Sequence, residues 1–153
     1  MEHLGYIMAL VGLGIMVSLS GTGSAMGLQI TGAALLGTLK KKPDAFGLCL
    51  VPFGMPATQG LYGFVGFIMY NTPTLINPSM TVFSGSVVLG AGIALGIACL
   101  TTAIKQGEIC AHGISAIGSG FNVFGNTIIL GAFPEFYAIL SLVAAILMKN
   151  LIS

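Results

Sequence analysis

Apolar residues fill four long stretches of the chain, and short polar segments separate them. The apolar stretches run approximately from Gly5 to Leu39, Ala45 to Tyr70, Val82 to Ile117 and Asn122 to Asn150. Each is longer than the ~20 residues that an α-helix needs to cross the hydrocarbon core of a bilayer. Membrane strands are not expected, because they alternate apolar and polar residues and this alternation is absent. The pattern therefore predicts an all-α membrane protein with four transmembrane helices.

Three polar connections join these stretches, at Lys40–Asp44, Asn71–Met80 and Gly118–Gly120. Three lysines, Lys40–Lys42, lie in the first connection, whereas only Lys149 lies near the end of the last stretch. Loops rich in lysine stay on the cytoplasmic side of a membrane. We therefore expect a multi-pass protein of the cell membrane in which the Lys40–Lys42 loop is cytoplasmic and both termini are outside.

A sparse internal repeat predicts that the helices form two fused hairpins within one transmembrane domain, residues 1–153. The first hairpin covers residues 5–70 and the second covers residues 82–150. Similar residues recur at two offsets: Phe46-Gly47 and Phe124-Gly125 at 78, Pro56 and Pro134 at 78, and Gly27 and Gly107 at 80. A second polar loop that is two residues shorter would reconcile the two offsets. Repeats of this kind are common in membrane transport proteins.

Small residues are concentrated in the first and third stretches. They are Gly12, Gly14, Gly21, Gly23, Ser24, Ala25 and Gly27 in one stretch, and Gly85, Gly90, Gly92 and Gly96 in the other. In lipid, small residues let helix backbones approach one another closely. The run Gly21–Gly27 superficially resembles a dinucleotide-binding loop, but such a loop follows a strand and none is expected here. These residues therefore predict tight helix packing.

Composition narrows the possible functions. Only 6% of the residues are charged, the net charge is +1 and the mean hydropathy is +1.02, whereas about a quarter of an ordinary soluble domain is charged. Nucleic acid is excluded as a partner, because the basic surface that it requires is missing. The cysteines, Cys49, Cys99 and Cys110, have no metal-binding or disulfide spacing. No phosphate loop or nucleophile constellation is present, so we expect no enzymatic active site on this chain.

One carboxylate, Glu135, lies near the middle of the fourth stretch. A charge at that depth costs roughly 2.5–3.5 kcal/mol on insertion scales, so an intramembrane carboxylate is by default functional. Gln59 and Glu135 each lie about 13 residues from the same membrane side, or about 20 Å along a helix. Gln106 reaches a similar depth in the third stretch. We therefore expect these three side chains to share one layer.

Further oxygen atoms come from the second stretch. Thr58 adjoins Gln59, and Tyr62 is one helical turn later. Because the residue before a proline is pushed away from helical geometry, the carbonyl of Met55 is expected to turn toward the same layer. An all-oxygen set with a single negative charge suits a hard monovalent cation, which predicts a Na⁺ site. The alternative is proton binding by Glu135 alone, with the glutamines as interhelical hydrogen-bonding groups.

Three segments, Thr58–Phe64, Gln106-Gly107 and Glu135–Leu140, resemble the proteolipid (rotor-ring, K or c-type) subunit of bacterial V-type Na⁺-translocating rotary ATPases. The resemblance covers essentially the whole chain. It implies that copies assemble into a membrane ring, with the glycine-rich first and third helices on the inside. It also implies the ligands of Na⁺, which are the side chains of Glu135, Gln59, Gln106 and Thr58 and the carbonyl of Met55, with Tyr62 hydrogen-bonded to Glu135.

The sequence also departs from the family. Met55 stands where an aliphatic residue is more usual, and Lys105 and Glu108 flank Gln106. Those two are expected to form an i,i+3 ion pair, and cation binding would be in doubt if Lys105 turned toward Glu135 instead. The first hairpin has Ala57 at the position equivalent to Glu135, which predicts one ion per double hairpin.

The expected function is that of a ring subunit that moves Na⁺ across the membrane as the ring rotates. A proton-carrying ring is the main alternative. A small four-helix proton-coupled antiporter or a purely structural oligomer fits less well, because such antiporters typically carry the carboxylate in the first helix with tryptophan nearby. The chain has no arginine, so the cation that displaces Na⁺ must come from another polypeptide. The resemblance implies that this is an arginine of a stator membrane subunit, and that central-stalk subunits of the ATPase are further partners.

Overall fold

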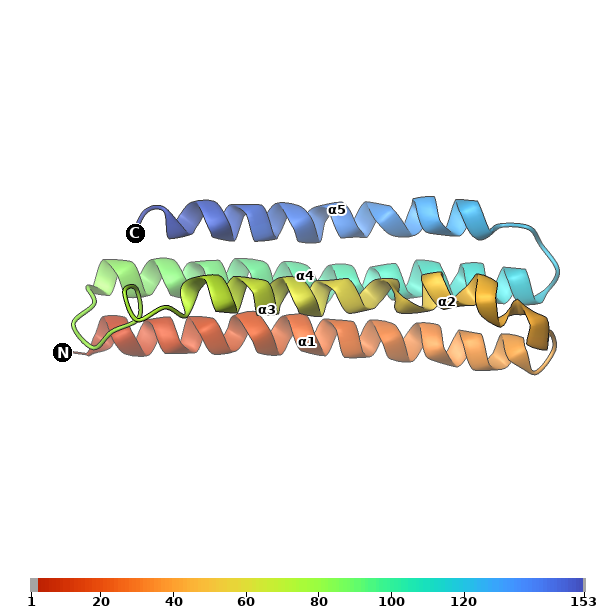
Figure 1. Cartoon of the computed structure of the whole chain (residues 1–153), viewed down its shortest axis with the longest axis horizontal. Helices are drawn as coiled ribbons and strands as arrows, with labels where there is room; N and C mark the ends of the chain where they lie inside the picture. The colour runs from red at the N-terminus through yellow and green to blue at the C-terminus, as the bar shows by residue number, and fades with distance from the viewer. Residues whose placement is uncertain (1–2, 153) are drawn as a thin grey trace.

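The structure is a computed structural model that describes residues 3–152, and it consists of four long helical rods lying side by side (Figure 1). Three rods are single helices, and the second contains two helices and two 3₁₀ turns. The elements in chain order are α1 (Leu4–Leu39), the turn Pro43–Ala45, α2 (Phe46–Gly54), the turn Met55–Ala57, α3 (Thr58–Tyr70), α4 (Val82–Gly118) and α5 (Phe124–Lys149). The described residues contain no strand, and each rod is long and apolar enough to cross a membrane. The prediction of an all-α protein with four spans is confirmed.

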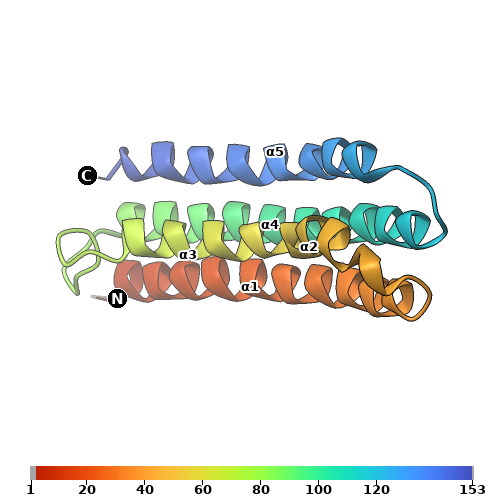
Figure 2. The ribbon, with the colours of Figure 1, turned by 45° about the vertical axis from the view of Figure 1, so that its right-hand side comes forward.

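The two hairpins point in the same direction. The loop between α3 and α4 lies at the end of the bundle where α1 begins and α5 ends, and the turns that follow α1 and α4 lie together at the other end (Figures 1 and 2). Consequently α1 and α4 run parallel to each other. The turn after α4 extends beyond the expected Gly118–Gly120 to Val123, and it bends at Gly120, whose φ of 94° favours glycine.

Close backbone contact holds α1 against α4 along their lengths. A Cβ atom added to Gly12 would lie 2.6 Å from Cα of Leu89, and one added to Gly27 would lie 2.6 Å from the carbonyl oxygen of Ala103. A Cβ atom on Gly92 would clash with the carbonyl oxygen of Gly12. Any side chain at these positions would therefore push the helices apart. The glycines place the two backbones in direct contact, as small residues do in membrane proteins.

The second rod is interrupted in mid-membrane. Pro56 lacks a backbone N–H and ends the regular hydrogen-bonding pattern of α2, and it packs its ring against Gly27 of α1. The hydroxyl of Thr31 in α1 donates to the carbonyl of Phe53, with an oxygen–oxygen distance of 2.9 Å. After the break, the N–H of Gly60 donates to Oγ of Ser24 at 2.7 Å. Side chains of α1 thus satisfy the backbone groups that the proline releases.

The fourth rod faces outward. α5 lies against α4 and α3 and carries large apolar side chains on its outer surface, among them Phe133, Phe136, Leu140 and Leu147, which are more than half exposed. An apolar surface of this kind in a membrane protein contacts lipid acyl chains. The chain is therefore a multi-pass membrane protein.

The contact between α1 and α4 can be tested with matched glycine substitutions. Gly92→Ala inserts a methyl group against the backbone of α1 and should destabilise the protein by about 1–3 kcal/mol. Gly47→Ala, in a helix where an added Cβ atom meets nothing within 4 Å, should leave stability unchanged or raise it by up to about 1 kcal/mol. Thermal unfolding of both variants in detergent, followed by circular dichroism, measures the difference. Equal unfolding temperatures would contradict the described packing.

Candidate ion-binding site

The carboxylate of Glu135 in α5 accepts hydrogen bonds from side chains of α3 and α4. The hydroxyl of Tyr62 donates to Oε1, and Nε2 of Gln106 donates to Oε2 at 2.7 Å. Oε2 also accepts from Oγ1 of Thr58 at 2.9 Å and from Nε2 of Gln59 at 3.2 Å. The structure therefore brings together the side chains that sequence analysis placed in one layer. Four donors around one carboxylate can stabilise its negative charge in a medium that contains no water.

The two glutamine side chains are fully buried and hydrogen-bonded to each other. Nε2 of Gln59 donates to Oε1 of Gln106 at 2.9 Å, and Nε2 of Gln106 donates to the carbonyl of Gly131 at 2.8 Å. Each amide nitrogen has two hydrogens, and the bonds to Glu135 use the second of each pair. No buried side-chain polar atom among the described residues lacks a partner. The amides are therefore fixed in place by a complete network.

The break in the second rod positions Thr58 and the carbonyl of Met55. Thr58 is the first residue of α3, and its hydroxyl lies 2.9 Å from the Met55 carbonyl oxygen. The expectation that Met55 departs from helical geometry is wrong, because its φ and ψ are −51° and −43°. A tight 3₁₀ turn accommodates the ring of Pro56 without that departure. The Met55 carbonyl nevertheless reaches the site through Thr58, and the Met55 sulfur contacts Sγ of Cys110 at 3.7 Å.

Lys105 does not approach Glu135. Its ammonium group forms an ion pair with Glu108, at 2.9 Å from Oε2 and 3.1 Å from Oε1, and the lysine side chain is 68% exposed. The expected i,i+3 pair is therefore present in the structure. Because Lys105 is engaged in this pair, it leaves the charge of Glu135 available to a cation.

Sequence analysis did not identify the carbonyl of Gly131 or the side chains of Ser24 and Thr31. The carbonyl of Gly131 fixes Gln106, and the two hydroxyl groups hold the broken rod against α1. A backbone carbonyl has no signature in sequence. Ser24 and Thr31 do carry a signal, because a hydroxyl group in an apolar helix needs an acceptor or a donor near it, and a neighbouring proline break supplies one.

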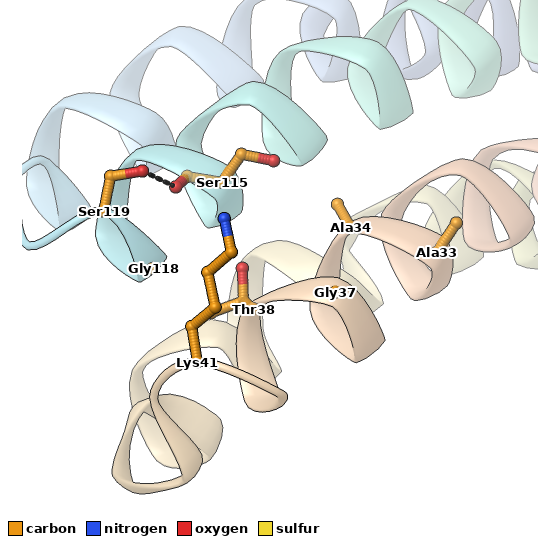
Figure 3. A pocket seen from close by; sticks show the side chains of 8 residues that line it. All are labelled: Ala33, Ala34, Gly37, Thr38, Lys41, Ser115, Gly118 and Ser119. Carbon is orange, nitrogen blue, oxygen red and sulfur yellow. Dashed lines mark hydrogen bonds between the residues drawn. The ribbon is translucent and has the colours of Figure 1, made fainter.

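A separate hollow lies far from this site, at the end of the bundle that carries the Lys40–Lys42 loop. It has a volume of about 380 Å³ and is enclosed by the ends of α1 and α4. Figure 3 shows Lys41 extending from the end of α1 toward Ser115 of α4, whose carbonyl accepts a hydrogen bond from Ser119. No carboxylate is among the described residues that line the hollow, so it does not share the chemistry of the Glu135 site.

Comparison with known proteins identifies the family. The family of the ATP synthase C subunit matches the chain twice, over residues 11–70 and over residues 89–148. The chain belongs to this family. The two matched segments begin and end 78 residues apart, so the family repeat aligns α1 with α4 and the second rod with α5. Gly27 and Gly107, at an offset of 80, are therefore not equivalent positions. They lie against each other in the contact between α1 and α4.

Curated relatives within this family come from three kinds of ATPase. Subunit K of the A-type ATP synthase of Methanocaldococcus jannaschii is 37% identical over 142 residues, which are 93% of the chain but only 61% of that relative. Subunit K of the V-type sodium ATPase of Enterococcus hirae is 35% identical over 117 residues, which are 76% of the chain and 72% of the relative. The 16 kDa proteolipid of the V-type proton ATPase of Nephrops norvegicus is 23% identical over 105 residues, which are 69% of the chain and 66% of the relative.

These relatives confirm the resemblance stated from the sequence. The chain is a membrane proteolipid of the V/A-type ATPases, and it is not one of their catalytic subunits. At the offset of the family repeat, Glu135 of the second hairpin corresponds to Ala57 of the first. One chain therefore carries one membrane carboxylate for two hairpins.

The support of the broken rod by α1 can be tested by removing one hydroxyl group. Ser24→Ala leaves the N–H of Gly60 buried without its acceptor, which should cost about 1–3 kcal/mol and increase hydrogen exchange at the start of α3. Ser86→Ala is the control, because the exposed Ser86 hydroxyl donates to its own helix, at Phe83. Hydrogen-exchange mass spectrometry in detergent measures both variants. Unchanged exchange at Gly60 in Ser24→Ala would contradict the described support.

Proposed function

We propose that this chain is the ion-carrying subunit of a rotor ring in a V/A-type rotary ATPase, and that the ion is Na⁺. In this proposal, residues 1–153 form one transmembrane unit whose hairpins, 5–70 and 82–150, repeat around the ring. Copies of the chain assemble with α1 and α4 on the inside and with the second rod and α5 toward lipid. Support comes from the glycine contact between α1 and α4 and from the apolar outer face of α5.

The observation that carries the choice of Na⁺ is the pair of fully buried glutamines at Glu135. A carboxyl group that only exchanges a proton needs no buried amides, which lose their hydration in the membrane. For Na⁺, the amide oxygens of Gln59 and Gln106, the hydroxyl of Thr58, the carbonyl of Met55 and the carboxylate of Glu135 supply an all-oxygen shell. One negative charge matches one monovalent ion. One relative is named a sodium ATPase subunit, which supports the same choice.

Carriage of H⁺ is the second candidate, and a specific observation favours it. Both amide nitrogens donate to the carboxylate, whereas coordination of Na⁺ would require the amides to turn their oxygens toward it. The relative from Nephrops norvegicus is named a proton ATPase proteolipid. The two candidates differ in what the glutamines do. They are ligands of the ion in the first case and donors to Glu135 in the second.

The mechanism follows from the charge of Glu135. With its cation bound, the site is neutral and can face lipid, and without it the carboxylate requires a counter-charge. Glu135 is half-buried rather than enclosed, so another protein can approach its carboxylate from the outer face of α5. The chain has no arginine, so we propose that a stator membrane subunit supplies the displacing cation and that central-stalk subunits couple the ring to ATP. The Lys40–Lys42 loop faces the cytoplasm, and the termini lie outside.

Selective labelling tests whether Glu135 is the carrier. A carbodiimide reacts with a protonated carboxyl group in an apolar environment, so it should modify Glu135, and millimolar Na⁺ should slow the reaction by occupying the site. The labelled residue is identified by mass spectrometry, with Glu135→Gln as the unreactive control. Glu108, which is paired with Lys105, should remain unlabelled. Labelling that depends on pH but is indifferent to Na⁺ would identify the carried ion as a proton.

Substitution of the ligands tests how the site divides its work. Glu135→Gln should abolish ion-driven rotation, because no charge remains for Na⁺ to compensate. Gln59→Leu or Gln106→Leu should weaken Na⁺ affinity by about 10- to 150-fold, since loss of a buried charge-assisted ligand costs roughly 1.5–3 kcal/mol. Tyr62→Phe removes a hydrogen bond to the carboxylate but no ligand, so its effect should be about tenfold or less.

The measurement is a Na⁺ titration of ATPase activity in the assembled complex. Thr58→Val should weaken Na⁺ binding, whereas Thr102→Val, whose hydroxyl bonds within its own helix, is the matched control. If Gln59→Leu and Gln106→Leu kept the Na⁺ dependence of the unmodified complex, the glutamines would not be ligands. The proton-carrying ring would then be the better account.

A further inference from the structure

An ion pair lies on α4 at the depth of the candidate site but outside it. Lys105 and Glu108 flank Gln106 in the sequence, and their side chains are 68% and 43% exposed. Charges at this depth that face lipid are costly, and such groups normally lie against a polar partner. The site does not provide that partner, because the described hydrogen bonds of Lys105 go to Glu108. The exposed face of α4 is therefore expected to meet another polar surface.

A polar side chain is exposed at a similar depth on α1. Gln29 lies ten residues before the end of α1 and is exposed, on a face that otherwise carries small residues. Cβ atoms added to Gly14 and Gly21 would meet nothing within 4 Å, whereas Gly12, Gly23 and Gly27 contact α4. The chain thus has one face of α1 that is filled by its own α4 and further small residues that are not covered.

The family repeat indicates which surfaces meet between copies. In a ring of repeated hairpins, α4 meets α1 of the next copy in the way that α1 meets α4 within the chain. Within the chain, Gly27 contacts Ala103 and Gly107. The position 78 residues after Gly27 is Lys105, and the positions 78 residues before Ala103 and Gly107 are Ala25 and Gln29. The repeat therefore pairs Lys105 of one copy with Ala25 and Gln29 of the next.

The same operation gives a consistent result elsewhere on these helices. The contact of Gly23 with Leu100 becomes a contact of Thr101 with Thr22 of the next copy. Lys105, Gln29, Thr101 and Thr22 are all exposed in the single chain. An incorrect alignment of the repeats would have returned some positions that are already buried. The exposed faces of α1 and α4 thus match the surfaces that the repeat assigns to the boundary between copies.

We propose that the Lys105–Glu108 pair of one copy binds the side chain of Gln29 of the next copy, in a polar contact beside the ion site. This rests on the ring assembly of the proposed function. An amide suits this position because its oxygen accepts from the ammonium group while its nitrogen donates to the carboxylate. Inside the chain, Gly27 and Gly107 occupy the equivalent positions and let the backbones touch. The boundary between copies is therefore wider and more polar than the contact within a copy.

Cysteine cross-linking tests the pairing. Lys105→Cys combined with Gln29→Cys should give a ladder of covalently linked copies after oxidation or after treatment with a short bifunctional thiol reagent. The single variants and the unmodified chain, whose Cys49, Cys99 and Cys110 are buried, should give none. Phe136→Cys combined with Gln29→Cys is a control at similar depth, because Phe136 lies on the outer face of α5.

A second pair keeps the ion pair intact in case the first variant fails to assemble. Thr101→Cys combined with Thr22→Cys should give the same ladder. Gln29→Leu removes the amide and keeps a side chain of similar bulk, so the ring should dissociate at a lower temperature in detergent. Native electrophoresis of the unmodified chain separates the possible failures. Assembled rings without a ladder from either pair would overturn this interface alone, whereas an absence of rings would overturn the proposed function as well.

Discussion

A single carboxylate in the hydrocarbon layer is the constraint on which the rest of this structure depends. Burying the charge of Glu135 costs roughly 2.5–3.5 kcal/mol on insertion scales, and only a local set of donors or a bound cation can offset that cost. The donors come from α3 and α4, while the carboxylate comes from α5. Three helices must therefore hold their depth relative to one another. The remaining features of the fold serve that requirement.

The glycines and the proline break meet it in different ways. Direct backbone contact between α1 and α4 fixes the height of Gln106, because a displaced helix would bring glycines against side chains. The break at Pro56 places Thr58 and Gln59 at the start of α3, where hydroxyl groups of α1 hold the interrupted rod. The carbonyl of Gly131 then fixes the amide of Gln106. Preorganised polar groups of this kind avoid rearrangement when an ion arrives.

Sequence predicted the helices and the site residues because both leave strong local signals. Long apolar stretches have no alternative to the helix in lipid, and a lone Glu or Gln in such a stretch is conspicuous. Contacts through backbone atoms left no such signal, so the Gly131 carbonyl was missed. Gly27 and Gly107 were also misinterpreted, since two glycines that touch and two glycines that are repeats look alike in sequence. The geometry of Met55 was wrong because a 3₁₀ turn accommodated the proline.

The central claim is that Glu135 holds Na⁺ in the middle of the membrane, in a ring formed by copies of this chain. A density map of the detergent-extracted assembly, prepared in Na⁺, tests it most directly. The account predicts a closed ring with α1 and α4 on the inside and a density peak for the ion between Glu135, Gln59 and Gln106. Separate monomers would contradict it, and so would a ring in which Glu135 faces the centre or in which the two amides donate to the carboxylate with no ion between them.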